Sequence, residues 1–135
     1  MTLDELVECG MALYVPCEGV DDGKNAHDIR ARLGEMIRRQ CGDPNVLLLV
    51  EATAYLDREA RKGRWDLKGD PASIVCDELI GISIAEYIGG KKALFNFIRY
   101  DREKPGVLSR LGVFMDDAVG GLVAGCMTRI FEDWR

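Results

Sequence analysis

This sequence has a single histidine, fewer basic than acidic residues, and no long hydrophobic run. His27 is the one histidine, and the five cysteines are scattered with no C-x-x-C pair, which argues against a zinc site and against a disulfide scaffold. The net charge of −5 argues against a nucleic-acid partner, because such proteins carry a basic surface. The longest uncharged apolar stretch, residues 118–128, has 11 residues, whereas a transmembrane helix needs roughly 20.

What remains is the composition of a folded domain. The chain has 135 residues, of which 47% are hydrophobic and 30% charged, and this predicts a single domain over residues 1–135 with one core. Thr2 and Glu5 stand at the spacing of a capping box, which indicates an N-terminal helix and not a signal peptide. We therefore expect a soluble, cytoplasmic protein.

Turn and capping residues divide the chain into about six helices. Asp43-Pro44 and Asp70-Pro71 each place an acidic N-cap before a proline, which favours a helix start at both positions. Residues 46–50 and 80–84 are rich in branched apolar side chains, so short strands are the alternative there. We predict an all-α, compact bundle whose buried central helix carries the first acidic pair described below. The expected helices cover about residues 3–14, 25–41, 44–62, 71–88, 91–100 and 113 to the end.

Two acidic pairs interrupt apolar helical segments. Asp77-Glu78 lies within residues 74–81 and Asp116-Asp117 within residues 113–120, and a glycine follows the first acid of each pair by four positions. An ionised carboxylate removed from water needs a cation or well-placed donors. Oxygen ligands suit Mg²⁺, with Mn²⁺ as the alternative ion. Capping of a helix N-terminus is the other interpretation; it suits Asp116 and Asp117, but we expect Asp77 about two turns inside its helix.

Asp101 and Lys104 lie between the two pairs, one helical turn apart. Asp101 offers a fifth carboxylate, and Lys104 offers a cation that holds phosphate as a point charge. The alternative is an ordinary surface salt bridge.

These segments together resemble the phosphatidylglycerophosphatase A superfamily, which includes membrane lipid phosphatases and small soluble all-helical relatives. The likeness is greatest to its archaeal α-ribazole-5′-phosphate phosphatase branch, CobZ. The residues that carry it are 73–81, Phe97-x-x-x-Asp101-x-x-Lys104-Pro105-Gly106, 112–121 and Tyr14-Val15-Pro16.

The resemblance implies a Mg²⁺-dependent phosphatase that hydrolyses α-ribazole 5′-phosphate, an intermediate in building the lower ligand of cobalamin. Glu78 is the candidate general base. Lys104 and Arg99 are the candidate substrate-binding residues. The candidate catalytic residues are Asp77, Glu78, Lys104 and Asp117, and the candidate metal ligands are Asp77, Glu78, Asp101, Asp116 and Asp117.

Departures from the lipid phosphatases favour a small soluble phosphorylated substrate. Ile98 stands where those enzymes commonly carry arginine, and Cys17 stands where their Val-Pro-Gly element has glycine. Three alternatives remain: a peripheral phosphatidylglycerophosphate phosphatase, a helical nucleotide pyrophosphohydrolase, and a non-catalytic, metal-stabilised interaction module. The small-residue face Gly121-x-x-x-Gly125 predicts a close helix contact, either within the chain or in a homo-oligomer.

Overall fold

The computed structural model describes residues 1–67, 69 and 71–134. Within these residues the protein is all-α, as predicted, and the two segments that could have been strands are helical. Buried side chains from all of the α-helices form one hydrophobic core. The elements are α1 (Leu3–Ala12), α2 (Ala26–Cys41), α3 (Pro44–Arg61), α4 (Cys76–Gly89), α5 (Lys92–Glu103), the 3₁₀ turn η1 (Gly106–Arg110) and α6 (Val113–Asp133).

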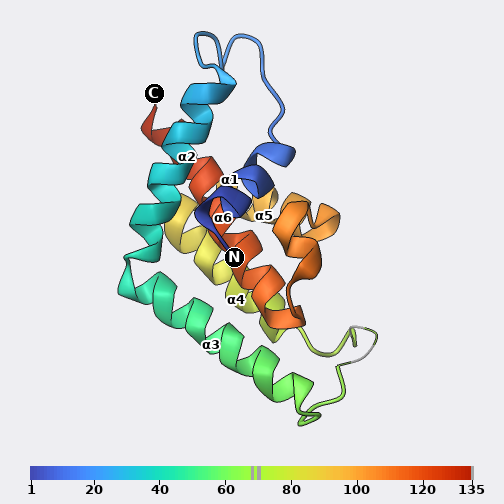
Figure 1. The fold of residues 1–135 in the computed structure, drawn as a ribbon. Helices are drawn as coiled ribbons and strands as arrows, with labels where there is room; N and C mark the ends of the chain where they lie inside the picture. Colours follow the sequence, from blue (N-terminus) through green and yellow to red (C-terminus); the bar gives the residue numbers. More distant parts are fainter. Residues whose placement is uncertain (68, 70, 135) are drawn as a thin grey trace.

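The central helix is α6, which carries the second acidic pair (Figure 1). Residues 117–127 are buried without interruption, and α6 contacts each of the other helices. The prediction that the helix of the first pair lies at the centre was wrong. That helix, α4, keeps an exposed side, where Leu79 and Tyr87 are 58% and 53% exposed. Glycine and alanine on several faces of α6 let neighbours approach it from all sides.

Helices α4 and α6 pack in parallel at very short range. A Cβ placed on Gly121 would overlap the carbonyl oxygen of Gly81, and one on Gly89 would lie 2.8 Å from that of Gly125. Because the residue numbers of the paired glycines increase together along both helices, the two helices run in the same direction. The small-residue face of α6 thus serves a contact within the chain, and the acid-bearing starts of α4 and α6 lie at the same end.

Helix α5 returns along both of them in the opposite direction. The ring of Phe97 lies against Gly81 and Gly120, and Asn96 Nδ2 lies 3.5 Å from the carbonyl oxygen of Ala124. A parallel pair of helices needs such a return segment. The C-terminal end of α5, with Asp101 and its neighbours, is therefore brought back to the starts of α4 and α6.

Helix α4 begins later than the sequence suggested. It starts at Cys76 with Val75 as N-cap, whereas the Asp70-Pro71 pair predicted a start at residue 71; Asp70 itself lies outside the described residues. The β-branched pair Ile74-Val75 disfavours helix at this point. Asp77 and Glu78 are therefore in the first turn of α4, and the expectation of a position two turns inside was wrong.

Other helix ends agree with their signals. Glu5 and Thr2 form the predicted capping box, with backbone-to-side-chain distances of 2.8 and 3.2 Å. Asp43 caps α3 by accepting from the backbone N–H of Asn45 at 2.8 Å. Among the described residues, no helix combines the length and the apolar character needed to cross a membrane.

Candidate active site

Four aspartates and one lysine gather where the starts of α4 and α6 meet the end of α5. We call this group the acidic cluster; its members are Asp77, Asp101, Lys104, Asp116 and Asp117. Asp77 and Asp117 are only 4% and 3% exposed. The parallel packing of α4 and α6 brings two positively polarised helix ends together, which favours carboxylates at this place.

Lys104 links two of the aspartates. Its Nζ lies 2.6 Å from Asp116 Oδ2 and 3.1 Å from Asp101 Oδ1. Burial opposes the charge of the ammonium group, but both carboxylates raise the pKa of Lys104 above its ordinary value. Lys104 ends α5 in the left-handed conformation with φ 44°, which costs a non-glycine residue about 1 kcal/mol or more. The backbone thus aims the ammonium group at the aspartates.

Asp117 is the most perturbed acid of the cluster. Burial, followed by hydrogen-bond contacts with the carboxylates of Asp101 and Asp77, raises the pKa of Asp117 to about 10. For Asp101, burial is more than offset by hydrogen bonds from Asp117 and Lys104, so its pKa is lowered. Burial also raises the pKa of Asp116, in spite of Lys104. Carboxylates this close need either a shared proton or a shared cation.

Three buried carboxylate oxygens of the cluster have no hydrogen-bond partner: the Oδ1 atoms of Asp77, Asp116 and Asp117. Unsatisfied buried oxygens are rare and point to a missing ion or water. Among the described residues, no group of three or more histidine, cysteine, aspartate or glutamate side chains is placed so that it could hold a metal ion. A Mg²⁺ ion is usually held by only one or two carboxylates and keeps waters or binds phosphate oxygens. The carboxylate oxygens of the cluster are the donor type that a hard divalent cation takes.

Two of the residues proposed from the sequence, Glu78 and Arg99, are exposed. Glu78 follows Asp77 in the first turn of α4, and its side chain is exposed. Arg99 is exposed, and its guanidinium donates to Asn96 and to the backbone carbonyl of Leu13. The structure therefore does not bring Arg99 to the acidic cluster, because α5 turns this side chain toward α1.

Asp57 is a contributor that sequence reasoning missed. Its carboxylate is 4% exposed and accepts the backbone N–H groups of Phe114 and Met115, both at 2.9 Å. It thereby caps α6 from α3, in place of Gly112, which has no side chain to offer. A Cβ on Gly112 would lie 2.5 Å from this carboxylate. Its position could have been noticed in the sequence, because Asp57 follows Val46, Val50 and Thr53 at three- and four-residue steps, on the face of α3 that points to the core.

The cysteine, tryptophan and histidine side chains considered next do not belong to the acidic cluster. Burial raises the pKa of the Cys9 thiol to about 11, so this thiol is a poor nucleophile. Trp134, at the far end of α6, stacks on Phe131 and lies under the guanidinium of Arg32. His27 lies exposed in the first turn of α2.

Comparisons with known proteins give a family and a fold for this chain. The family model described as phosphatidylglycerophosphatase A matches residues 46–132. A Methanocaldococcus jannaschii protein, described as uncharacterized protein MJ1330, is 38% identical over 132 residues, covering 93% of this chain and 100% of its own. The crystal structure of the low temperature requirement C protein from Listeria monocytogenes superposes with a TM-score of 0.79 at 22% identity. That match covers 99% of this chain and 88% of the other, and it shows the fold alone.

Proposed function

Because the chain belongs to the phosphatidylglycerophosphatase A family, we propose that it is a Mg²⁺-dependent phosphomonoesterase whose active site is the acidic cluster. Membership in this family implies phosphatase activity; the metal, the substrate and the residue roles are our proposal. The observation that carries it is the set of three partnerless, buried carboxylate oxygens in the acidic cluster. Such an arrangement is costly in a fold that has no use for a cation.

Asp77, Asp116 and Asp117 are the proposed ligands, of which one or two would hold the cation directly, with Asp101 beside them. Mn²⁺ would be an alternative to Mg²⁺. A divalent ion there would supply Lewis-acid polarisation of the phosphoryl group and a more acidic bound water. Asp117 would bind it as a carboxylate, having given up the proton that its surroundings otherwise favour.

Lys104 and the start of α4 would bind the phosphate. The side chain of Lys104 is 40% exposed. Its ammonium group can therefore contact a phosphate oxygen while it stays paired with Asp116. The N-cap residue of α4 is Val75, which has no side-chain acceptor. The first N–H groups of α4 thus point toward an anion-binding position, as at other helix N-termini.

Glu78 is the proposed general base. It lies one residue from Asp77 on the exposed side of the same turn, where water reaches it. A carboxylate in this position can take a proton from the attacking water as the P–O bond forms.

The preferred substrate of the proposal is α-ribazole 5′-phosphate, in cytoplasmic cobamide synthesis. It rests on the resemblance of residues 77–88 and 114–125 to that branch. The second candidate is phosphatidylglycerophosphate, favoured by the name of the matching family model.

Orthophosphate release from both substrates, with Mg²⁺ and with EDTA, tests the proposal. We expect release that EDTA abolishes, and a loss of at least about 100-fold in Asp77→Asn and in Asp117→Asn at saturating Mg²⁺. Asp133→Asn is the control, because this exposed acid pairs with Arg129 far from the cluster. Near-normal turnover in both cluster variants would disprove the assignment of the site. Pyrophosphate release would indicate a pyrophosphohydrolase, and Mg²⁺-raised stability with no hydrolysis would indicate a metal-stabilised interaction module.

A further inference from the structure

A cavity of about 380 Å³ lies between the end of α3 and the starts of α4 and α6, the two helix starts that also carry the acidic cluster. Two of its residues adjoin the cluster in sequence: Cys76 directly precedes Asp77, and Phe114 precedes Asp116 by two positions. We call it the Trp65 cavity. Its wall is mainly apolar and includes Leu56, Trp65, Leu67, Ile74, Cys76 and Phe114.

Apolar side chains in and near the cavity wall are partly exposed to solvent. Trp65 is 38% exposed, and Ile74 and Val75 at the approach to α4 are 39% and 44% exposed. Covering such surface gains about 25 cal/mol per Å². The volume also falls in the range of small-molecule sites, roughly 300–1,000 Å³. The cavity therefore has the size and lining of a site for an apolar group.

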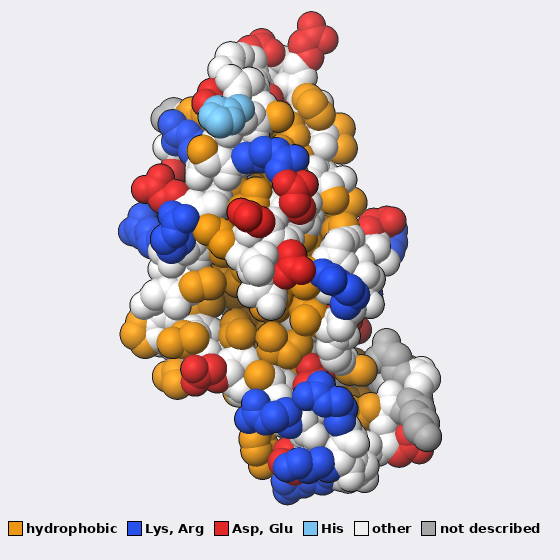
Figure 2. Space-filling view, viewed as in Figure 1, with side chains coloured by type: hydrophobic (Ala, Val, Ile, Leu, Met, Phe, Trp, Pro, Cys, Tyr) orange, Lys and Arg blue, Asp and Glu red, His pale blue; other side chains and the backbone are white. Residues whose placement is uncertain are grey.

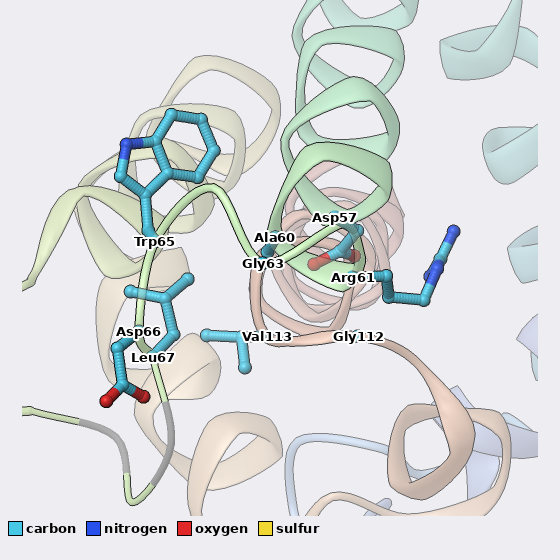
Figure 3. Close-up of a pocket in the computed structure, with 9 residues that line it drawn as sticks. All are labelled: Asp57, Ala60, Arg61, Gly63, Trp65, Asp66, Leu67, Gly112 and Val113. Atoms are coloured by element: carbon cyan, nitrogen blue, oxygen red, sulfur yellow. The ribbon is translucent and has the colours of Figure 1, made fainter.

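A second cavity, of about 610 Å³, shares the segment 65–67 as a wall and is otherwise formed by α3 and the start of α6. Figure 3 shows the indole of Trp65 pointing away from Asp57 and Arg61. Trp65 therefore stands between the two cavities, and the guanidinium of Arg64 lies 5.0 Å from its ring centroid.

Several basic side chains lie at this end of the molecule, although the net charge is −5 and Glu59 pairs with Lys62 and Arg64. Figure 2 shows basic side chains gathered where α3 ends. A local positive potential attracts an anionic ligand. The exposed basic residues of the last turn of α3 and the segment after it are Arg58, Arg61, Lys62 and Arg64.

We propose that the Trp65 cavity binds a planar aromatic ring in the alcohol part of the substrate, while the phosphate lies at the acidic cluster. This inference rests on the proposed phosphatase function. The flat indole face of Trp65 suits an offset-stacked ring, and Leu56 and Ile74 supply apolar contacts. A cavity of this volume accommodates one ring system and not two long acyl chains.

Three primary alkyl phosphates with similar leaving groups test the specificity: 2-(1-naphthyl)ethyl, octyl and ethyl phosphate. We expect kcat/KM for the naphthyl ester to exceed that for the ethyl ester by about tenfold or more. In Trp65→Ala this ratio falls toward one. In Tyr55→Ala, which removes an aromatic ring from α3 outside the cavity (47% exposed), the ratio is retained. A ratio that Trp65→Ala leaves unchanged, or an equal preference for the octyl ester, would overturn the proposal.

A binding measurement separates this inference from the proposed function. Titration with benzimidazole should shift the indole N–H signal of Trp65 saturably in a ¹H–¹⁵N spectrum and leave that of Trp134 in place. If no ester is hydrolysed but this shift occurs, the phosphatase proposal fails and the ring site stands. If the esters are hydrolysed and the Trp65 signal does not move, the ring site fails and the phosphatase stands.

Discussion

At the scale of single residues, Asp117 is a buried acid whose surroundings favour its protonated form. It is 3% exposed, its Oδ1 atom has no partner, and its pKa is raised to about 10. A cation would reverse this preference for the proton. Without a cation, a neutral side chain of the same shape should be better tolerated than the native one.

We therefore expect Asp117→Asn to stabilise the protein in EDTA at pH 8 while it abolishes hydrolysis. A gain of about 1 kcal/mol would raise Tm by roughly 2–8 °C. Thermal melts of the native protein, Asp117→Asn and the surface control Asp133→Asn measure this. A lower Tm for Asp117→Asn in EDTA would contradict the proposed strain.

Asp57 stabilises the start of α6 from a different helix. Removing both of its accepted hydrogen bonds in Asp57→Ala should cost about 1–2 kcal/mol or more, as for a lost helix cap, and should lower activity by displacing Asp116 and Asp117. The control is Asn25→Ala, which removes the N-cap of α2, away from the cluster. It should cost similar stability with activity retained. Urea unfolding and orthophosphate release give the two readouts, and equal activities would argue against a positioning role for Asp57.

At the scale of helices, the contact of α4 with α6 sets the spacing of the acids. Gly121→Ala would drive a Cβ into the carbonyl oxygen of Gly81, and overpacking of this kind costs about 1–3 kcal/mol or more. We expect a lower urea midpoint and lost activity. Gly34→Ala on α2 is the matched control, because its Cβ would meet Val7 at 3.5 Å; it should be neutral or stabilising by up to about 1 kcal/mol. If Gly121→Ala behaves like Gly34→Ala, the acids do not depend on this contact.

The sequence predicted the helices and the members of the acidic cluster better than their arrangement. Capping and proline signals located most helix ends, because they report local backbone preferences. They failed at α4, where Ile74-Val75 delays the start. They could not show which helix is central, because burial of α6 depends on partners distant in sequence. Asp57 was missed for the same reason, since the helix it caps begins 56 residues further along the chain.

At the scale of the whole molecule, the cluster couples stability to pH. Asp117 has an ordinary pKa of 3.8 and a folded-state pKa of about 10, so the folded state holds the extra proton between these values. Its stabilising contribution is complete below about pH 4 and is lost as pH rises toward 10. The maximum slope is about 1.4 kcal/mol per pH unit.

In EDTA, we therefore expect the free energy of unfolding to fall between about pH 6 and pH 9, measured by urea titration at each pH. Mg²⁺ should flatten this decline, because a cation replaces the proton. In Asp117→Asn, we expect the free energy of unfolding to decline less with pH even in the absence of metal. An equal slope in the native protein and in Asp117→Asn would show that another group is responsible.

Because α4 and α6 are parallel, their C-terminal ends lie far from the acidic cluster, and the surface there can be modified without touching the proposed site. The connection from α4 to α5 lies at the end of α4 opposite to the acids, about 20 Å away for its 14 residues at 1.5 Å each. Gly90, in this connection, has φ 73°, and a Cβ placed on it would meet nothing within 4 Å. A short glycine-rich insertion there would give a tether for immobilisation or a dye, remote from substrate and cation alike.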